Sequence, residues 1–216
     1  MSALTAIDIL IEPDEATRER AIGLNTALRE SFAAGFAFDD THRPHITMLQ
    51  RYVRSDDLDA AIEAAGALAA RDGPTPRLRA VGLVSGSFGT PPGTLLASIA
   101  FEPVSALRSL QAELVEATTP FAGSGGDASA FFTTPDEPDV NDATIAYVEG
   151  FVPAQCGERY EPHLSVGVGR EDVVGTLAAE PFDDLWSSAT AFAVYRLGNL
   201  GAAREALRRW PVVGVE

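Results

Sequence analysis

The chain has 216 residues, a net charge of −15 at pH 7 and no lysine, so that arginine supplies all 16 of its basic side chains. Such acidity argues against binding to a long nucleic-acid duplex, because non-specific affinity for a polyanion comes from cationic side chains that neutralise its phosphates. The single cysteine, Cys156, excludes an intrachain disulfide.

Strands and helices are predicted to alternate through the first half of the chain. The β-branched run at 4–12 predicts a strand, and Asp14 is placed to cap the helix that follows it. Ser55 is likewise placed to cap a helix that ends at Gly73-Pro74. The remaining elements of this half are a strand at 44–53 and a hairpin formed by 77–88 and 93–102.

The second half repeats strand and helix signals around one long irregular stretch. Residues 122–139 are rich in glycine, serine, proline and aspartate, a composition that predicts a loop. Around this loop we expect a helix beginning at Pro103, helices at 139–150 and 171–179, strands at 162–169 and 189–201, and a closing helix at 202–210.

The beginning of the chain has no feature of a targeting segment. It lacks a basic stretch, and its apolar run is interrupted by Asp8 and Glu12, which argues against a signal peptide. No stretch of the sequence is long and apolar enough to span a bilayer. We therefore expect a cytoplasmic protein that does not associate with membranes.

One short motif occurs once in each half. Pro44-His45-Ile46-Thr47 and Pro162-His163-Leu164-Ser165 both consist of proline, histidine, an apolar residue and a hydroxyl residue. Because side chains alternate along a strand, each copy presents its imidazole and hydroxyl on one face and its apolar residues on the other. If the two halves are related by a pseudo-twofold axis, the two polar pairs face each other across a cleft.

Two imidazoles and two hydroxyls around one cleft suit chemistry at phosphorus without a metal. A neutral imidazole can accept the proton of an attacking water or hydroxyl, and a protonated one can donate a proton to the leaving oxygen. The hydroxyls of Thr47 and Ser165 can donate hydrogen bonds to non-bridging phosphate oxygens. A zinc site is less favoured, because His45 and His163 lack acidic or cysteine partners at ligand spacing.

The paired motifs resemble those of the 2H (two-histidine) phosphoesterase superfamily, which includes the 2′-5′ RNA ligase-like proteins and cyclic phosphodiesterases. The ending at 193–211 is similar to the closing strand and helix of bacterial members. The resemblance implies an α+β fold in which residues 1–216 form a single bilobal domain. Two antiparallel-rich sheets, flanked by helices and related by a pseudo-twofold axis, would surround a central cleft.

The resemblance also implies roles for the four motif residues. His45 and His163 would be the catalytic acid–base pair, Thr47 and Ser165 would bind the phosphate, and no metal or other cofactor would be needed. The implied substrate is the 2′,3′-cyclic, or a related cyclic, phosphate of a nucleotide or of a short RNA end.

Two alternative functions stay open. The first is 2′-5′ RNA ligation, which is the same chemistry run backwards, although an acidic chain is poorly suited to holding two RNA ends. The second is a nucleotide-binding module without turnover, although retention of all four motif residues argues against loss of activity.

Residues near the motifs give weaker expectations. Strict strand alternation places Arg51 on the face of the first histidine, where it would bring positive charge to the edge of the cleft or form a surface ion pair. Tyr52 and Tyr160 flank the motifs, and packing in the core or at the rim is favoured over stacking on a base. His42 is expected to be a loop histidine outside the motif, and Cys156 to be unreactive.

The loop at 122–139 has two interpretations of about equal weight. Its pair Phe131-Phe132 would be unfavourable in water, so the rings are expected to dock near the cleft or on the second half, with the glycine-rich part at 123–126 serving as a mobile partial lid. Alternatively, the phenylalanines only fill an edge of the core.

Overall fold

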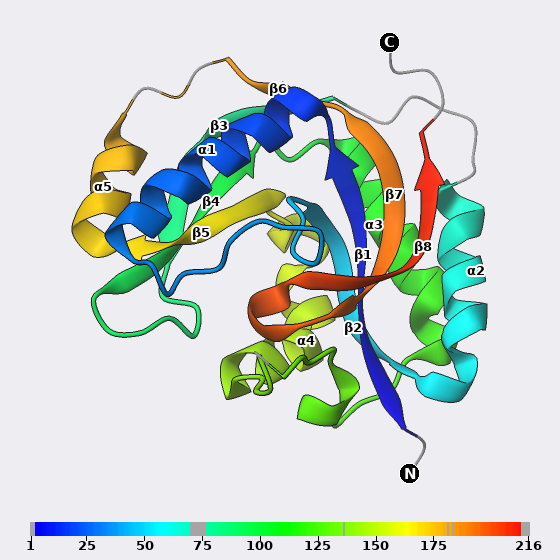
Figure 1. Ribbon diagram of the computed structural model, residues 1–216. Coiled ribbons are helices and arrows are strands. Elements are labelled where there is room, and N and C mark those ends of the chain that lie inside the picture. The colour runs from blue at the N-terminus through cyan, green and yellow to red at the C-terminus, as the bar shows by residue number, and fades with distance from the viewer. Residues whose placement is uncertain (1–2, 70–76, 136, 181, 183, 213–216) are drawn as a thin grey trace.

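The computed structural model describes residues 3–69, 77–135, 137–180, 182 and 184–212. Two antiparallel sheets of four strands each, flanked by helices, build an α+β protein, as the sequence predicts (Figure 1).

The first sheet has the strand order β2-β1-β7-β8. Strand β1 is buried from Thr5 to its end, which explains why its sequence is mostly apolar and rich in isoleucine. The strands are β1 (Leu4–Pro13), β2 (Ile46–Arg54), β7 (Ala189–Leu197) and β8 (Ala203–Pro211).

The second sheet has the strand order β5-β4-β3-β6, and it contains the expected hairpin as β3 and β4. Both strands that carry a motif, β2 and β5, lie at an edge of their sheet. The two-residue strand β6 is too short to leave a pattern in the sequence. The strands are β3 (Leu78–Gly86), β4 (Thr94–Phe101), β5 (His163–Arg170) and β6 (Trp186–Ser187).

Two helices pack beside the sheet that does not contain the strand preceding them in the chain. Helix α1 follows β1 but packs on β5 of the second sheet, whereas α3 follows β4 and packs with α2 beside the first sheet (Figure 1). Within the described residues, no helix is long and apolar enough to cross a membrane. The helices are α1 (Glu15–Ser31), α2 (Leu58–Ala69), α3 (Ser105–Thr118), α4 (Asp142–Gln155) and α5 (Glu171–Ala179).

Side-chain caps determine where two of these helices begin. Asp14 accepts a hydrogen bond from the backbone N–H of Thr17, as the prediction of an N-cap requires. Asn141 accepts one from the N–H of Thr144, so α4 begins three residues later than predicted and continues to Gln155. Asn141 lies inside the helix that the sequence predicts at 139–150, so the cap moves the predicted start of that helix.

The predicted cap at Ser55 is wrong. Residues Ser55–Asp57 form a short 3₁₀ turn ahead of α2, and the Ser55 hydroxyl hydrogen-bonds the hydroxyl of Thr5 on β1 at 2.9 Å. The predicted helix end at Gly73-Pro74 lies outside the described residues. Other 3₁₀ turns are Thr119–Phe121, Ala128–Ala130, Gly157–Arg159 and Asn199–Gly201.

The predicted closing helix is also wrong, because residues 203–211 form strand β8. A tight turn reverses the chain after β7, with Leu200 and Gly201 both at positive φ. The returning segment then hydrogen-bonds along the open edge of β7 in antiparallel register. Alanine, leucine, glutamate and arginine favour a helix, but pairing with a free sheet edge outweighs a weak local preference.

The loop at 122–139 packs against the first sheet. Phe131 is buried and meets the ring of Tyr52 edge to face at 5.9 Å, and the backbone N–H of Phe132 donates to the carbonyl of Leu197 at 2.7 Å. Gly126 lies so close to the Tyr52 ring that an added Cβ would approach it to 2.4 Å. Gly123 and Gly126 are therefore closely packed, whereas Ser124 and Gly125 between them are exposed. The packing at both ends of the glycine-rich segment supports the core-edge interpretation over the mobile lid.

Substituting Gly126 with alanine tests this packing. We expect the free energy of unfolding to fall by about 1–3 kcal/mol, because the new methyl group overlaps the Tyr52 ring. Steady-state kinetics should stay unchanged. Gly23→Ala is the matched control, since nothing lies within 4 Å of its Cβ position in helix α1. A lid role would instead appear as a change in KM at unchanged stability.

Candidate active site

The edge strands β2 and β5 lie in contact with each other, and a cavity of about 270 Å³ lies between the two sheets. His45, Thr47, His163 and Ser165 all line this cavity. The two motifs, far apart in the sequence, are thereby brought together around one space large enough for a small ligand.

Both motif histidines are oriented by the same backbone contact. Nδ1 of His45 lies 2.8 Å from the carbonyl oxygen of Arg43, and Nδ1 of His163 lies 2.9 Å from the carbonyl oxygen of Glu161. A carbonyl only accepts hydrogen bonds, so Nδ1 of each ring carries a proton. Nε2 is therefore the nitrogen of each imidazole that is available for chemistry.

Each motif strand contains a β-bulge one residue beyond its hydroxyl residue. In β2 the pairing with β1 shifts at Met48, and in β5 the pairing with β4 shifts at Val166. A bulge reverses the alternation of side chains beyond it. Gln50 consequently lines the cavity together with the two residues of the first motif.

The prediction that Arg51 lies on the face of the first histidine is wrong because of the bulge in β2. Beyond the bulge its side chain turns away from the cavity toward helix α3, where Nη1 donates to the carbonyl of Val115 at 3.2 Å and to the hydroxyl of Thr118 at 2.7 Å. Arg51 thus ties β2 to α3. Among the described residues, no arginine lines the cavity.

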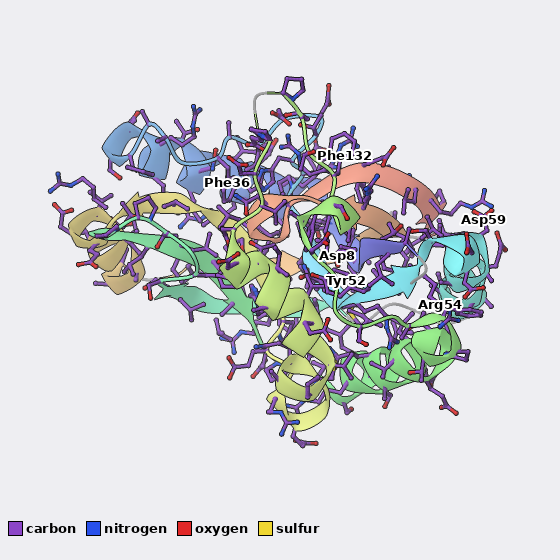
Figure 2. The ribbon with its side chains drawn as sticks, turned by 90° about the horizontal axis from the view of Figure 1, so that it is seen from below. Asp8, Phe36, Tyr52, Arg54, Asp59 and Phe132 are labelled. Atoms are coloured by element: carbon purple, nitrogen blue, oxygen red, sulfur yellow. The ribbon has the colours of Figure 1, made fainter. Side chains whose placement is uncertain are left out.

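Asp8 on β1 is a site residue that the sequence reasoning missed. Its carboxylate is fully buried, and Oδ2 accepts hydrogen bonds from Thr47 Oγ1 at 2.9 Å and Gln50 Nε2 at 3.1 Å. The same oxygen lies 3.5 Å from Nε2 of His45. Figure 2 shows Asp8 well inside the molecule, whereas Arg54 and Asp59 lie toward its periphery. An acidic residue in the middle of a mostly apolar strand was the signal available in the sequence.

The pKa of His45 reflects two opposing influences. Burial of the ring is the largest single influence and lowers the pKa, but the hydrogen bond and negative charge of Asp8, together with smaller contributions from the Arg43 carbonyl and Glu12, outweigh it, and the net pKa lies above its ordinary value. The second motif has a neutral neighbour instead, because Ser165 Oγ lies 3.2 Å from the hydroxyl oxygen of Ser98 on β4.

Aromatic side chains form the walls of the cavity. In one group the imidazole of His42 stacks on Phe36 with ring centroids 4.1 Å apart, and Phe38 meets it edge to face. In a second group Phe88 meets Tyr147 of α4 edge to face at 5.0 Å. Two aromatic surfaces therefore line the cavity together with the polar motif residues.

His42 lies in the loop before β2, as expected, and its ring belongs to this wall of the cavity. Burial, together with the nearby charges of His45 and Arg204, lowers the pKa of His42 to about 3 against the opposing influence of Asp39. The ring is therefore neutral at physiological pH and acts as an aromatic surface. Stacking on Phe36 depends on the fold of the 32–45 segment, which has no regular pattern in the sequence.

The tyrosines next to the motifs are packed in the core, as expected. Tyr52 donates its hydroxyl to the carbonyl of Ile145 at 3.1 Å. Tyr160 donates to the carbonyl of Thr47 at 2.8 Å and so links the segment before β5 to the first motif. Burial raises the pKa of the Cys156 thiol to about 11, which keeps it protonated and unreactive at neutral pH.

The donor set offers no evident metal site. Within the part of the chain that the structure describes, no group of three or more histidine, cysteine, aspartate or glutamate side chains is placed to hold a metal ion.

A two-sheet α+β fold with a His-x-Thr/Ser motif on each of two facing edge strands defines the chain as a 2H phosphoesterase in class. A model of the 2′-5′ RNA ligase superfamily matches residues 25–200, and the chain belongs to this superfamily. No curated protein matches the chain in sequence.

Solved structures are similar to this chain at low sequence identity, and the first of them shares its fold. TT0787 of Thermus thermophilus is 16% identical with a TM-score of 0.60, and the match covers 98% of this chain and 100% of that one. LigT of E. coli, complexed with 3′-AMP, is 16% identical with a TM-score of 0.45 over 99% and 100% of the two chains. Usb1 of Kluyveromyces marxianus is 8% identical with a TM-score of 0.48 over 98% and 99%.

Proposed function

We propose that the chain is a cytoplasmic, metal-independent phosphoesterase that opens 2′,3′-cyclic, or related cyclic, phosphates of nucleotides or short RNA ends. The observation that carries this proposal is the placement of His45 and His163 around one cavity, each with Nδ1 bound to a backbone carbonyl and Nε2 left for proton transfer. General acid–base catalysis by two such groups needs only that both reach the same substrate.

The proposed reaction is hydrolysis of one P–O bond of the cyclic phosphate. One imidazole takes a proton from water as its oxygen attacks phosphorus, and the other gives a proton to the ribose oxygen that leaves. The non-bridging oxygens gain charge during attack, and the hydroxyls of Thr47 and Ser165, which line the same cavity, would donate hydrogen bonds to them.

The cavity favours a small substrate. Its volume of about 270 Å³ and its aromatic walls suit a nucleoside beside the reacting phosphate. With no arginine among its described lining residues, the cavity offers little to bind further phosphates of an RNA strand. The expected partner is therefore a small cyclic-phosphate nucleotide or an RNA terminus, and neither a long duplex nor a membrane.

Turnover of a substrate panel in the presence of EDTA tests the proposal. We expect nucleoside 2′,3′-cyclic phosphates to be opened to monophosphates, with short RNA ends that carry the same cyclic group as slower substrates. Joining of RNA ends to a 5′-hydroxyl would favour 2′-5′ ligation instead. Saturable nucleotide binding without product would indicate a binding module, and loss of all turnover in EDTA would contradict the metal-independent mechanism.

Removing the Tyr147 ring tests the proposed base-binding wall. We expect Tyr147→Ala to raise KM for cyclic nucleotides by about tenfold, because stacking of a base on an aromatic ring contributes about 1–3 kcal/mol. Tyr147→Phe keeps the ring and should bind nucleotides like the parent protein. An unchanged KM in the alanine variant would exclude this ring from substrate binding.

A further inference from the structure

The two halves of the candidate site differ by one buried charge. In the first sheet, the strand next to the motif places the carboxylate of Asp8 against the hydroxyl of Thr47. In the second sheet, the strand next to the motif places the neutral hydroxyl of Ser98 against the hydroxyl of Ser165. Two otherwise matching motifs therefore hold their imidazoles in different electrostatic surroundings.

His45 faces a hydrogen-bond acceptor at each ring nitrogen. Nδ1 lies 2.8 Å from the Arg43 carbonyl, and Nε2 lies 3.5 Å from Oδ2 of Asp8. Because neither a carbonyl nor a carboxylate donates, a proton on both nitrogens is favoured, which is the imidazolium form. His163 has the matching carbonyl at Nδ1, but within the described ranges no carboxylate forms an ion pair with it. Its Nε2 is left with a free lone pair.

The burial of the Asp8 carboxylate indicates that this residue has a functional role in addition to packing. The residue is fully buried, two donors bind Oδ2, and Oδ1 has no hydrogen-bond partner among the described protein atoms. An unpaired or partly paired carboxylate in the interior lowers stability. Such groups are concentrated at functional sites, where they shift the protonation of a neighbour.

We propose that Asp8 is a positioning residue that gives the two histidines different roles. It holds His45 protonated as the donor to the leaving oxygen and leaves His163 as the acceptor of the nucleophile's proton. The assignment of roles rests on the proposed function, whereas the pairing of Asp8 with His45 can be measured without it.

The proton balance of the step follows from this assignment. The attacking water loses a proton to Nε2 of His163 as its oxygen bonds to phosphorus. The P–O bond to the leaving ribose oxygen breaks, and that oxygen takes the Nε2 proton of His45. The two imidazoles end with their protonation states exchanged, and exchange with solvent restores them.

Other ionisable groups around His45 do not replace Asp8 in this role. Glu12, farther along β1, also raises the pKa of His45, but its oxygens are engaged by Tyr195 at 3.0 Å and Arg209 at 2.8 Å. The guanidinium of Arg43 points toward Asp40 at the surface, at 3.6 Å from its carboxylate.

The remaining titratable neighbours are uncharged at neutral pH. Burial lowers the pKa of His42 to about 3, so its ring adds no positive charge beside His45. Burial, with the charge of Asp8 as the next cause, raises the pKa of Tyr147 to about 12 and raises that of Tyr160 as well. Asp8 is thus the charged group in direct contact with the first imidazole.

NMR titration of the three histidine rings tests the pairing without any need for activity. Signals are assigned by their loss in His45→Gln and His163→Gln. We expect His45 in the parent protein to titrate above the ordinary histidine value of about 6.5. In Asp8→Asn, which keeps the shape but removes the charge, its midpoint should fall by about one pH unit or more, while the His163 signal titrates as before. Ser98→Ala is the matched control and should move neither signal.

The pairing of Asp8 with His45 also predicts the direction in which the pH profile of kcat/KM should shift. The protonated form of His45 is lost as pH rises through its pKa, so a lower pKa in Asp8→Asn should move the alkaline limb of kcat/KM to lower pH by about one unit. Two results would overturn the proposal: the same His45 midpoint in the parent and in Asp8→Asn, or a parent midpoint at or below about 6.5. Because the second result needs only the parent protein, the test holds even if the variant does not fold. Absence of any cyclic-phosphate turnover would instead contradict the proposed function, and the titration would still test the pairing of Asp8 with His45.

Discussion

Replacing His45 or His163 with alanine is expected to lower the turnover of a cyclic phosphate by about 10²–10⁴-fold while the fold is retained. Each imidazole lines the cavity, and each is held by a backbone carbonyl so that Nε2 is the reacting atom. Loss of either ring removes one of the two proton transfers. Steady-state kinetics with a nucleoside 2′,3′-cyclic phosphate, together with circular dichroism, measures the effect.

The double variant and the third histidine serve as controls. Because the two rings act in one step, the His45→Ala, His163→Ala double variant should be about as slow as either single variant rather than slower by the product of both effects. His42→Phe keeps the aromatic surface beside Phe36 and should lose less than about tenfold, mostly through KM. Undiminished turnover in the double variant would place the chemistry elsewhere in the molecule.

Removing the motif hydroxyls should give similar kinetic losses but different losses of stability. Thr47→Val and Ser165→Ala are each expected to raise the barrier by at most about 3 kcal/mol, roughly 10²-fold in rate, through a lost hydrogen bond to the phosphate. In the free protein Thr47 donates its one hydroxyl proton to the buried carboxylate of Asp8, and it would exchange this acceptor for the phosphate when substrate binds. Loss of the hydroxyl should therefore also cost about 1–3 kcal/mol of unfolding free energy.

The contrast between the two variants provides the control. Ser165 contacts only the hydroxyl of Ser98 among the described side chains, so Ser165→Ala should melt close to the parent temperature. Thermal melts and kinetics on the same samples separate the two effects. Equal melting temperatures for both variants would contradict the role of Thr47 as a partner of the buried carboxylate.

The sequence predicts those elements of the fold that have strong local patterns. The strand at 4–12, the cap at Asp14 and the hairpin at 77–102 all have signals within a few residues, and all are present. The segment at 202–210 fails because its helical composition is overridden by the free edge of β7, which lies outside any local window.

The sequence predicts only part of the candidate site, because one of its contacts depends on strand pairing that no local window contains. His45, Thr47, His163 and Ser165 stand out because the same motif occurs twice, and the structure brings all four to one cavity. Asp8 lies far from His45 in the sequence, and its contact with that ring depends on the pairing of β1 with β2.

Strict alternation also misplaces the residues beyond the first motif. The bulge at Met48 sends Gln50 into the cavity and Arg51 toward α3. A bulge of this kind leaves no clear mark in a single sequence.

The pH dependence of kcat/KM for a nucleoside 2′,3′-cyclic phosphate, measured with EDTA present, tests the central claim most directly. Acid–base catalysis by two imidazoles predicts a bell-shaped profile, since one ring must be neutral and the other protonated in the free enzyme. The His45 pKa, raised by Asp8 against the effect of burial, should set the alkaline limb. A rate that rises steadily with pH, or that disappears on chelation, would contradict catalysis by the histidine pair.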